Sequence, residues 1–167
     1  RGVEPDFELL EDIASEAFMP LSYGGGIKSL EQVRRLLTIG YEKIVINTEL
    51  VKNPGLVKAA VQLAGSQSVV ASIDVKYVNK QYRCFVGDGR ECVDIAPVEL
   101  AKKAEMLGVG EIFLNSIDKD GEMKGYDISL VKSVVEAVKI PVTACGGAGR
   151  IDDLRKVIHD GMAHAAA

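Results

Sequence analysis

Two glycine clusters are the first residues of this sequence whose type and spacing could carry chemistry. Gly24–Gly26 form one cluster, and Gly146 and Gly147 begin the other. Each cluster follows an apolar run and precedes an amphipathic one, which predicts a strand, a loop and a helix. Glycines in such a loop let backbone N–H groups approach a phosphate, and the helix N-terminus favours its negative charge. A plain tight turn is the alternative at either cluster, but the pair favours an elongated bisphosphate substrate.

Polar side chains after two further apolar runs could complete a site. Asn47 and Thr48 follow one run and could donate hydrogen bonds to the first phosphate, although a turn at the end of a strand is the alternative. Asp74 ends the most apolar run, where burial would raise its pKa and suit it to act as a general acid or base. A salt bridge is the alternative there, because Lys76 lies two residues on and points to the same side.

Other reactive side chains are weaker candidates. Asp118 and Asp120 lie in an Asp-Lys-Asp-Gly stretch that also suits a turn. His159 is expected within a helix and His164 at the opposite rim, so neither is expected to act as a base. The cysteines are odd in number and have no CxxC spacing, which predicts reduced thiols, no metal site and no cofactor; they are Cys84, Cys92 and Cys145.

Composition excludes several classes of protein. The 167 residues are 47% hydrophobic and 26% charged, which is typical of a globular chain. The formal charge of −4 and the lack of Trp do not favour nucleic-acid binding. No apolar run is long enough for a membrane span, and the first residues do not resemble a secretory signal. A cytoplasmic protein with small-molecule ligands is expected.

The elements that must position these residues alternate between helix and strand. Helices are expected over 6–17, 29–40, 53–65, 97–107, 127–138 and 151–158. Strands are expected over 19–22, 43–46, 69–73, 112–114 and 141–144, with 164–167 as a strand cut short. Apolar strands that alternate with helices indicate a parallel sheet with helices on its outer side. The stretch 77–94 is expected to form a hairpin about Gly87, Asp88 and Gly89 that covers the site.

A repeat distinguishes an open sheet from a barrel. A shift of 121 residues lays Gly25 and Gly26 on Gly146 and Gly147, and the helices that follow also align. Two such repeats would occupy about 240 residues, the size of a (β/α)8 TIM barrel. We therefore expect an α/β fold in which 1–167 form a single partial barrel domain. It would hold strands 3 to 7, without strands 1 and 2 and most of strand 8. Active sites of this fold lie at the C-terminal ends of the strands. Both glycine clusters, Asn47, Thr48, Asp74 and the stretch 115–121 are expected at this rim.

Several segments together resemble the cyclase subunit of imidazole glycerol phosphate synthase, the HisF family. They are 22–27, 43–48, 65–70, 72–76, 115–127 and 145–149, in order along the whole chain. The resemblance implies a lyase of histidine biosynthesis with a glutaminase (HisH-like) partner that supplies ammonia. The cyclase converts phosphoribulosyl-formimino-aminoimidazole carboxamide ribotide into imidazole glycerol phosphate and aminoimidazole carboxamide ribotide.

The resemblance also assigns roles to individual residues. Asp74 corresponds to the family's catalytic aspartate on strand 5, while the aspartate on strand 1 has no counterpart here. Phosphate sites are implied at Gly26, Asn47 and Thr48, and at Asp120, Gly121 and Gly147. Lys43 and Glu111 match residues that gate the ammonia passage at the barrel floor. From the sequence alone, both would be solvated charges where strands begin.

Two departures from the family pattern leave other functions open. Tyr23 and Val75 are typical of a paralogous branch that delivers ammonia to amidino sugars of surface polysaccharides. A non-catalytic barrel fragment is a third possibility, because one of the two acids has no counterpart in this chain.

Overall fold

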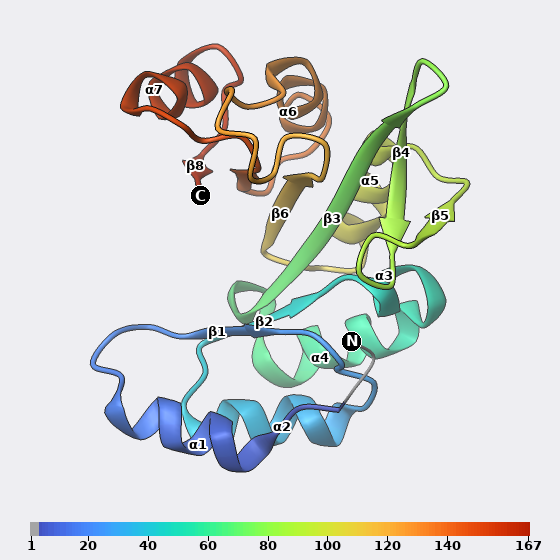
Figure 1. Cartoon of the computed structure of the whole chain (residues 1–167). Helices are drawn as coiled ribbons and strands as arrows, with labels where there is room; N and C mark the ends of the chain where they lie inside the picture. Colours follow the sequence, from blue (N-terminus) through green and yellow to red (C-terminus); the bar gives the residue numbers. More distant parts are fainter. Residues whose placement is uncertain (1–3) are drawn as a thin grey trace.

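The computed structural model describes residues 4–167, which form one curled, mostly parallel sheet with helices on its outer side (Figure 1). The parallel strands follow the order β1-β2-β3-β6-β7-β8. They are β1 (Ser22–Gly24), β2 (Lys43–Ile46), β3 (Val69–Val78), β6 (Glu111–Ser116), β7 (Val142–Cys145) and β8 (Ala165–Ala166). Five strands and a short sixth in sequential order confirm the predicted partial (β/α)8 barrel.

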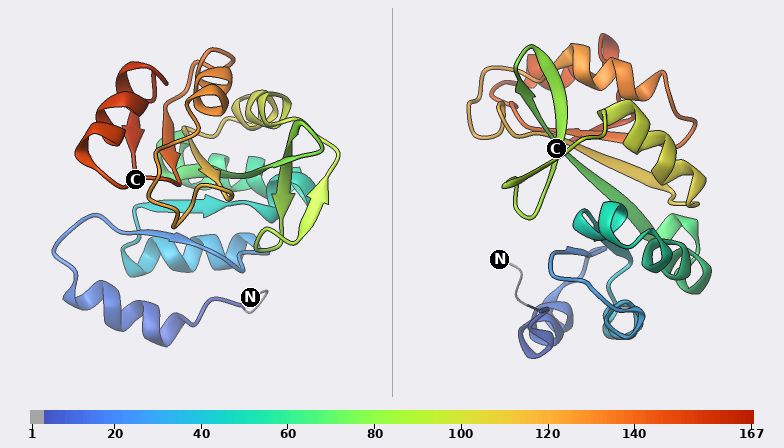
Figure 2. Two further views of the ribbon diagram at one scale, coloured as in Figure 1. Left: turned by 45° about the horizontal axis from the view of Figure 1, so that its top comes forward. Right: turned by 90° about the vertical axis from the view of Figure 1, so that its right-hand side faces the viewer.

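The helices form an arc around the convex side of this sheet, as the right-hand view of Figure 2 shows. They are α1 (Phe7–Glu16), α2 (Leu30–Ile39), α3 (Thr48–Lys52), α4 (Pro54–Ala64), α5 (Pro97–Met106), α6 (Ile128–Val135) and α7 (Ile151–His159), with a 3-10 turn, η1 (Ser66–Ser68). None of the helices within residues 4–167 has the length and apolarity to cross a membrane.

Local signals in the sequence start and end these helices. Ser29 and Gln32 form the predicted capping box at the start of α2. Gly40 ends the helix in a left-handed conformation with φ 116°. Asp127 accepts a hydrogen bond from the N–H of Leu130 and so caps α6. These bonds satisfy N–H groups that the first helical turn leaves without partners.

The core lies between the sheet and the helices. Successive residues of β3 point to opposite sides, so Ile73 and Val75 are fully buried while Ser72 and Asp74 lie on the concave side. Other side chains with almost no exposure come from both layers: Leu36, Leu130, Ile44, Ile112 and Leu114. Burying a side chain of this size contributes about 1.5 to 3 kcal/mol, so this layer holds the strand ends in place.

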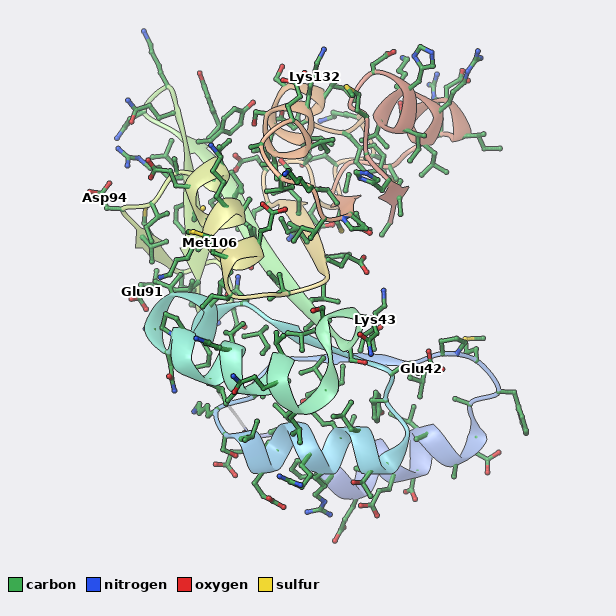
Figure 3. The ribbon with its side chains drawn as sticks, turned by 180° about the vertical axis from the view of Figure 1, so that it is seen from behind. Glu42, Lys43, Glu91, Asp94, Met106 and Lys132 are labelled. Atoms are coloured by element: carbon green, nitrogen blue, oxygen red, sulfur yellow. The ribbon has the colours of Figure 1, made fainter. Side chains whose placement is uncertain are left out.

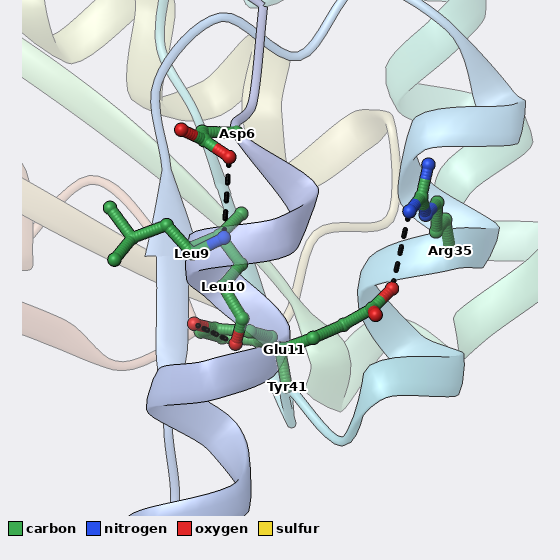
Figure 4. Close-up of polar contacts among 6 residues, drawn as sticks. All are labelled: Asp6, Leu9, Leu10, Glu11, Arg35 and Tyr41. Carbon is green, nitrogen blue, oxygen red and sulfur yellow. Dashed lines mark hydrogen bonds and ion pairs between the residues drawn. The ribbon is translucent and has the colours of Figure 1, made fainter.

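Helix α1 packs on this core near β2 by a mixture of polar and apolar contacts (Figure 4). Asp6 caps the helix, and Leu10 is buried. The Tyr41 hydroxyl donates to the Leu10 carbonyl oxygen at 3.2 Å. Arg35 pairs with Glu11 at 3.2 Å, which joins α1 to α2.

Some predicted boundaries are wrong. The strand expected over 19–22 begins only at Ser22, where it pairs with Lys43, and the side chain of Met19 is 71% exposed. An apolar run there predicts a strand, but the partner strand starts too late to pair with it. The short helix α3 and the turn η1 were not predicted either, because neither is long enough to show a periodic pattern.

The hairpin over 77–94 is confirmed but has more strands than predicted. Strand β3 continues to Val78, turns back into β4 (Gln81–Val86), and β4 pairs with β5 (Glu91–Val93). The missed first turn consists of Asn79 and Lys80, both with positive φ. Two-residue hairpin turns with positive φ are recognised in a sequence by Asn-Gly or Asp-Gly. Here Lys80 takes the place of the glycine, so the sequence pattern does not indicate the turn.

Candidate active site

A cavity of about 520 Å³ opens at the C-terminal ends of β1, β2 and β3. The first glycine cluster, Gly24–Gly26, lines one side of it. Asn47 and Thr48 line it after β2, and Asp74 lines it from β3. The structure thus brings these candidates together, and the turn of the hairpin adds a further wall. Residues 49 positions apart in the sequence meet because parallel strands end at one rim.

Asp74 is held by a neighbour on the next strand. The side-chain amide of Asn115 donates to Asp74 Oδ1 at 3.2 Å. Burial raises the pKa of Asp74, the Asn115 hydrogen bond opposes this, and the nearby carboxylates of Asp120 and Asp88 raise the pKa further. A carboxyl group with a raised pKa exchanges a proton more readily near neutral pH, as a general acid or base must.

The alternative salt bridge between Asp74 and Lys76 is wrong. Lys76 Nζ donates instead to the Gly89 carbonyl oxygen at 3.0 Å and lies 4.8 Å from the ring centroid of Phe85. No ion pair within residues 4–167 includes Asp74. Lys76 therefore holds the hairpin turn, and the carboxylate of Asp74 stays available at the cavity.

The sequence places Asn115 in the rim stretch 115–121 but gives it no role in the site. It is the β6 partner of Asp74 in the sheet register, and this register is the signal that could have identified it. Its Oδ1 is buried and accepts no hydrogen bond within the described residues. A buried acceptor without a donor is costly, so this atom suits a hydrogen-bond donor from solvent or substrate.

Asn47 and Thr48 connect the rim to the hairpin. Asn47 Nδ2 donates to the Ser72 carbonyl oxygen at 3.1 Å, and the N–H of Gly87 donates to Thr48 Oγ1 at 3.2 Å. The Thr48 hydroxyl is 3.5 Å from Asn47 Oδ1, a long contact. A hydroxyl can donate and accept at once, so Thr48 can bind the hairpin and still offer its proton to an anion.

The second group of candidates has a different environment. The Asp120 N–H donates to the Ser116 carbonyl oxygen at 3.0 Å, and Gly121 has a φ of 76° with open space around it. A Cβ on Gly147 would lie 2.3 Å from the Gly125 carbonyl oxygen. Packing against Gly125 thus accounts for glycine at this position. None of these residues lines the cavity.

Two aspartates near this loop hold the base of the hairpin. Asp118 Oδ2 accepts a hydrogen bond from the Tyr77 N–H at 2.6 Å, and the Tyr82 hydroxyl donates to Asp127 at 2.9 Å. Because the Asp118 carboxylate is used in this way, its role is to position the end of β3.

Lys43 and Glu111 lie at the opposite ends of the strands from the cavity, where β2 and β6 begin; Figure 3 shows Lys43. They form an ion pair, and Thr143 Oγ1 donates to Glu111 at 2.7 Å. Burial alone would raise the pKa of Glu111, but the hydrogen bonds from Lys43 and Thr143 lower it. The Glu111 side chain is only 19% exposed, so these residues are not freely solvated charges.

The remaining reactive side chains lie elsewhere. His159 pairs with Asp160 on the surface, and His164 Nδ1 accepts a hydrogen bond from the Val142 N–H. All three cysteines have free thiols. Within residues 4–167, no group of three or more His, Cys, Asp or Glu side chains is arranged to hold a metal ion.

A curled parallel sheet with outer helices and a polar cavity at its carboxyl rim defines the (β/α)8-barrel class of protein. The family described as histidine biosynthesis protein matches residues 1–167, and the chain belongs to this family. The resemblance to HisF is confirmed by relatives that carry this name.

Three relatives illustrate the similarity. "Putative imidazole glycerol phosphate synthase subunit HisF" of Leptospira interrogans is 43% identical over 162 residues, 96% of this chain and 64% of that protein. "Putative imidazole glycerol phosphate synthase subunit hisF2" of Pseudomonas aeruginosa is 46% identical over 152 residues, 90% and 61% of the two chains. Imidazole glycerol phosphate synthase subunit HisF of Pyrococcus furiosus is 42% identical over 160 residues, 96% and 64%. The chain spans about three fifths of the length of these relatives.

Proposed function

We propose that the protein is the cyclase subunit of imidazole glycerol phosphate synthase and acts in histidine biosynthesis in the cytoplasm. It would use ammonia to convert phosphoribulosyl-formimino-aminoimidazole carboxamide ribotide into imidazole glycerol phosphate and aminoimidazole carboxamide ribotide. The observation that carries this proposal is the cavity in which Gly24–Gly26, Thr48 and Asp74 meet. It combines a glycine loop, whose backbone N–H groups could bind a phosphate, with a carboxyl group whose pKa is raised.

Asp74 would transfer protons at the reacting carbons. Ammonia must lose protons as it forms its bonds to carbon, and the amino nitrogen of the departing aminoimidazole carboxamide ribotide must gain one. A carboxyl group can take up a proton and release it again, and burial that raises its pKa favours this exchange. Asn115 would keep the Asp74 carboxyl group directed at the substrate. A second acid, on a further strand of the closed barrel, would share this work in the whole protein.

The two phosphates would hold the substrate at both ends. One would bind at Gly26, Asn47 and Thr48, which line or border the cavity beside Asp74. The other would bind near Asp120, Gly121 and Gly147, whose loop follows β6 and β7. Asp120 is close enough to influence the pKa of Asp74. The reacting centre would therefore lie between the two anchors.

Ammonia would arrive from the opposite end of the barrel, from a glutaminase subunit bound as a heterodimer. Lys43 and Glu111 lie at that end and are linked by an ion pair. A pair of opposite charges can open by rotation of the lysine side chain, which would let a small neutral molecule pass. Thr143 would keep Glu111 fixed while Lys43 moves.

A paralogue that supplies ammonia for amidino sugars is the second candidate. Two relatives carry numbered names, "Putative imidazole glycerol phosphate synthase subunit hisF2" and "hisF3", and such numbers are consistent with more than one member of this family in an organism. Tyr23 and Val75 do not help to decide. Val75 is fully buried, Tyr23 packs against the ring of Tyr41, and neither lines the cavity.

Product formation by the whole protein separates these candidates. Wild type is given an ammonium salt and the open-chain bisphosphate, and imidazole glycerol phosphate is measured. Thr48→Val should raise KM about ten- to a hundred-fold, because it removes a donor to a charged group. Thr48→Ser keeps the hydroxyl and should remain close to wild type. No product from wild type would contradict the histidine-pathway proposal and favour the paralogue.

A further inference from the structure

The turn between β4 and β5 holds an arginine at the wall of the cavity. Arg90 lines the same cavity as Gly25, Gly26 and Thr48. Its backbone N–H is bonded to the Val86 carbonyl oxygen at 3.2 Å, as expected within a tight turn. Its guanidinium group makes no hydrogen bond or ion pair with any residue of 4–167. The cavity therefore contains a cation that has no partner among residues 4–167.

The position of this turn is fixed by its neighbours. The N–H of Gly87 donates to Thr48 Oγ1, and the carbonyl oxygen of Gly89 accepts from Lys76 at 3.0 Å. On the other side, Glu91 pairs with Lys52 at 2.5 Å. Contacts on both sides of Arg90 thus hold the backbone in place, which lowers the entropic cost of a contact with a ligand.

The groups around Arg90 match the chemistry of a phosphate. A guanidinium group offers several N–H donors in one plane and binds phosphate oxygens in pairs. Glycine backbone at Gly25 and Gly26 and the Thr48 hydroxyl provide further donors at the same cavity. The carboxylates that also line the cavity would repel an anion unless a cation stood between them; they are Glu49, Asp74 and Asp88.

We propose that Arg90 contacts the phosphate held at Gly26, Asn47 and Thr48, and that it makes this cavity selective for phosphorylated substrates. This rests on the proposed function and adds to it a binding residue from the hairpin. Thr48 joins the two parts, since its oxygen accepts from the turn while its proton is available to the same phosphate. Binding of the phosphate and placement of Arg90 therefore depend on each other.

A matched pair of variants in the whole protein tests this proposal. Arg90→Gln removes the cation, and Arg83→Gln removes the same charge from the same hairpin. Arg83 pairs with Asp94 at 2.6 Å and does not line the cavity. The measurements are KM for the open-chain bisphosphate and the inhibition constant of inorganic phosphate. Arg90→Gln should raise both about tenfold with kcat within twofold, because the contact is made equally in the ground and transition states.

Arg90→Lys should recover part of the affinity, since it keeps the charge but loses the paired hydrogen bonds. Equal effects of Arg90→Gln and Arg83→Gln, or values for Arg90→Gln that match wild type, would overturn the role of Arg90. Wild type that does not turn over the bisphosphate would instead overturn the proposed function, and direct titration of wild type and Arg90→Gln with inorganic phosphate would then test the role of Arg90. The two failures are thus distinguished by wild type alone.

Discussion

The two glycine clusters are related by the 121-residue repeat, yet they do different work in the structure. Gly25 and Gly147 have almost the same backbone conformation, with φ of 119° and 112°. A Cβ on Gly25 would meet nothing within 4 Å, whereas a Cβ on Gly147 would lie 2.3 Å from the Gly125 carbonyl oxygen. Gly146 and Gly149 are similarly close to backbone atoms, at 2.6 and 2.2 Å.

The comparison shows that a glycine pattern alone does not identify a binding loop. At the first cluster, a Cβ on Gly24 would lie 2.8 Å from the Val45 Cβ, but Gly25 is open to the cavity that Asp74 also lines. At the second, the absence of a side chain lets Gly125 and Met123 approach closely. The structure thus supports phosphate binding more strongly at the first cluster than at the second. Glycine at the second cluster is required by packing, whether or not a phosphate binds there.

The largest expected effect is on kcat, and it comes from substitution of Asp74, which lines the cavity beside Gly24–Gly26. Asp74→Asn keeps the shape and can still accept from Asn115, but it cannot exchange a proton. We expect kcat of the whole protein to fall by about two to four orders of magnitude, with KM changed little. Asp118→Asn is the control, since that carboxylate binds the Tyr77 N–H instead. An Asp74→Asn enzyme with half the wild-type kcat would show that the carboxyl group is not catalytic.

A matched pair of substitutions tests the difference between the clusters directly. Gly25→Ala and Gly147→Ala impose the same unfavourable φ, which costs about 1 to 2 kcal/mol. Only Gly147→Ala also forces the Gly125 backbone to move, which adds about 1 to 3 kcal/mol. Urea unfolding of the whole protein should therefore show a lower free energy of unfolding for Gly147→Ala. Equal losses of unfolding free energy in the two variants would contradict the structural difference between Gly25 and Gly147.

The pKa of Asp74 predicts how stability depends on pH. Burial raises the pKa of Asp74 in the folded state, so ionisation of this group opposes folding. Its contribution to stability is fully present below the pKa of the unfolded chain and is lost as pH rises through the folded pKa. Asp74→Asn should therefore raise the urea midpoint at neutral pH relative to wild type. The gain should vanish below the ordinary range of an Asp pKa, and a gain that persists there would contradict this origin.

The smallest effect is expected at the far end of the strands. Hydrogen bonds from Lys43 and Thr143 outweigh burial and lower the pKa of Glu111, so its contribution is present above the unfolded pKa and lost as pH falls through the folded one. Thr143→Val removes one of these bonds and should cost under about 1 kcal/mol at neutral pH. The loss should shrink in acid, which unfolding at two pH values would check. A loss that is the same at both would assign the effect to packing.

Much of the fold could be predicted because its signals are local. The capping box of Ser29 and Gln32 and the apolar runs of β2 and β3 are visible in the sequence. What escaped prediction depends on distant contacts. Met19 is apolar but has no strand to pair with, and Asn115 contacts Asp74 only through the register of β3 and β6.

In the candidate site, too, some features follow from local sequence signals and others depend on contacts between distant residues. Placement of Asn47, Thr48 and Asp74 at one rim follows from the fold, and the cavity agrees with it. The use of Thr48 to hold Gly87 was not predictable, since it requires the hairpin to fold over the rim. The packing of Gly147 on Gly125 was not predictable either, because it depends on how close the loops after β6 and β7 come to each other.

Phosphate binding by the glycine cluster beside Asp74, Gly24–Gly26, underlies the proposed function. Its most direct test is a titration of the isotopically labelled whole protein with inorganic phosphate, followed through the amide resonances of Gly25, Gly26 and Thr48. We expect saturable shifts at these three amides in wild type and weaker binding in Thr48→Val. Amides that stay unmoved while phosphate shifts resonances elsewhere would contradict it.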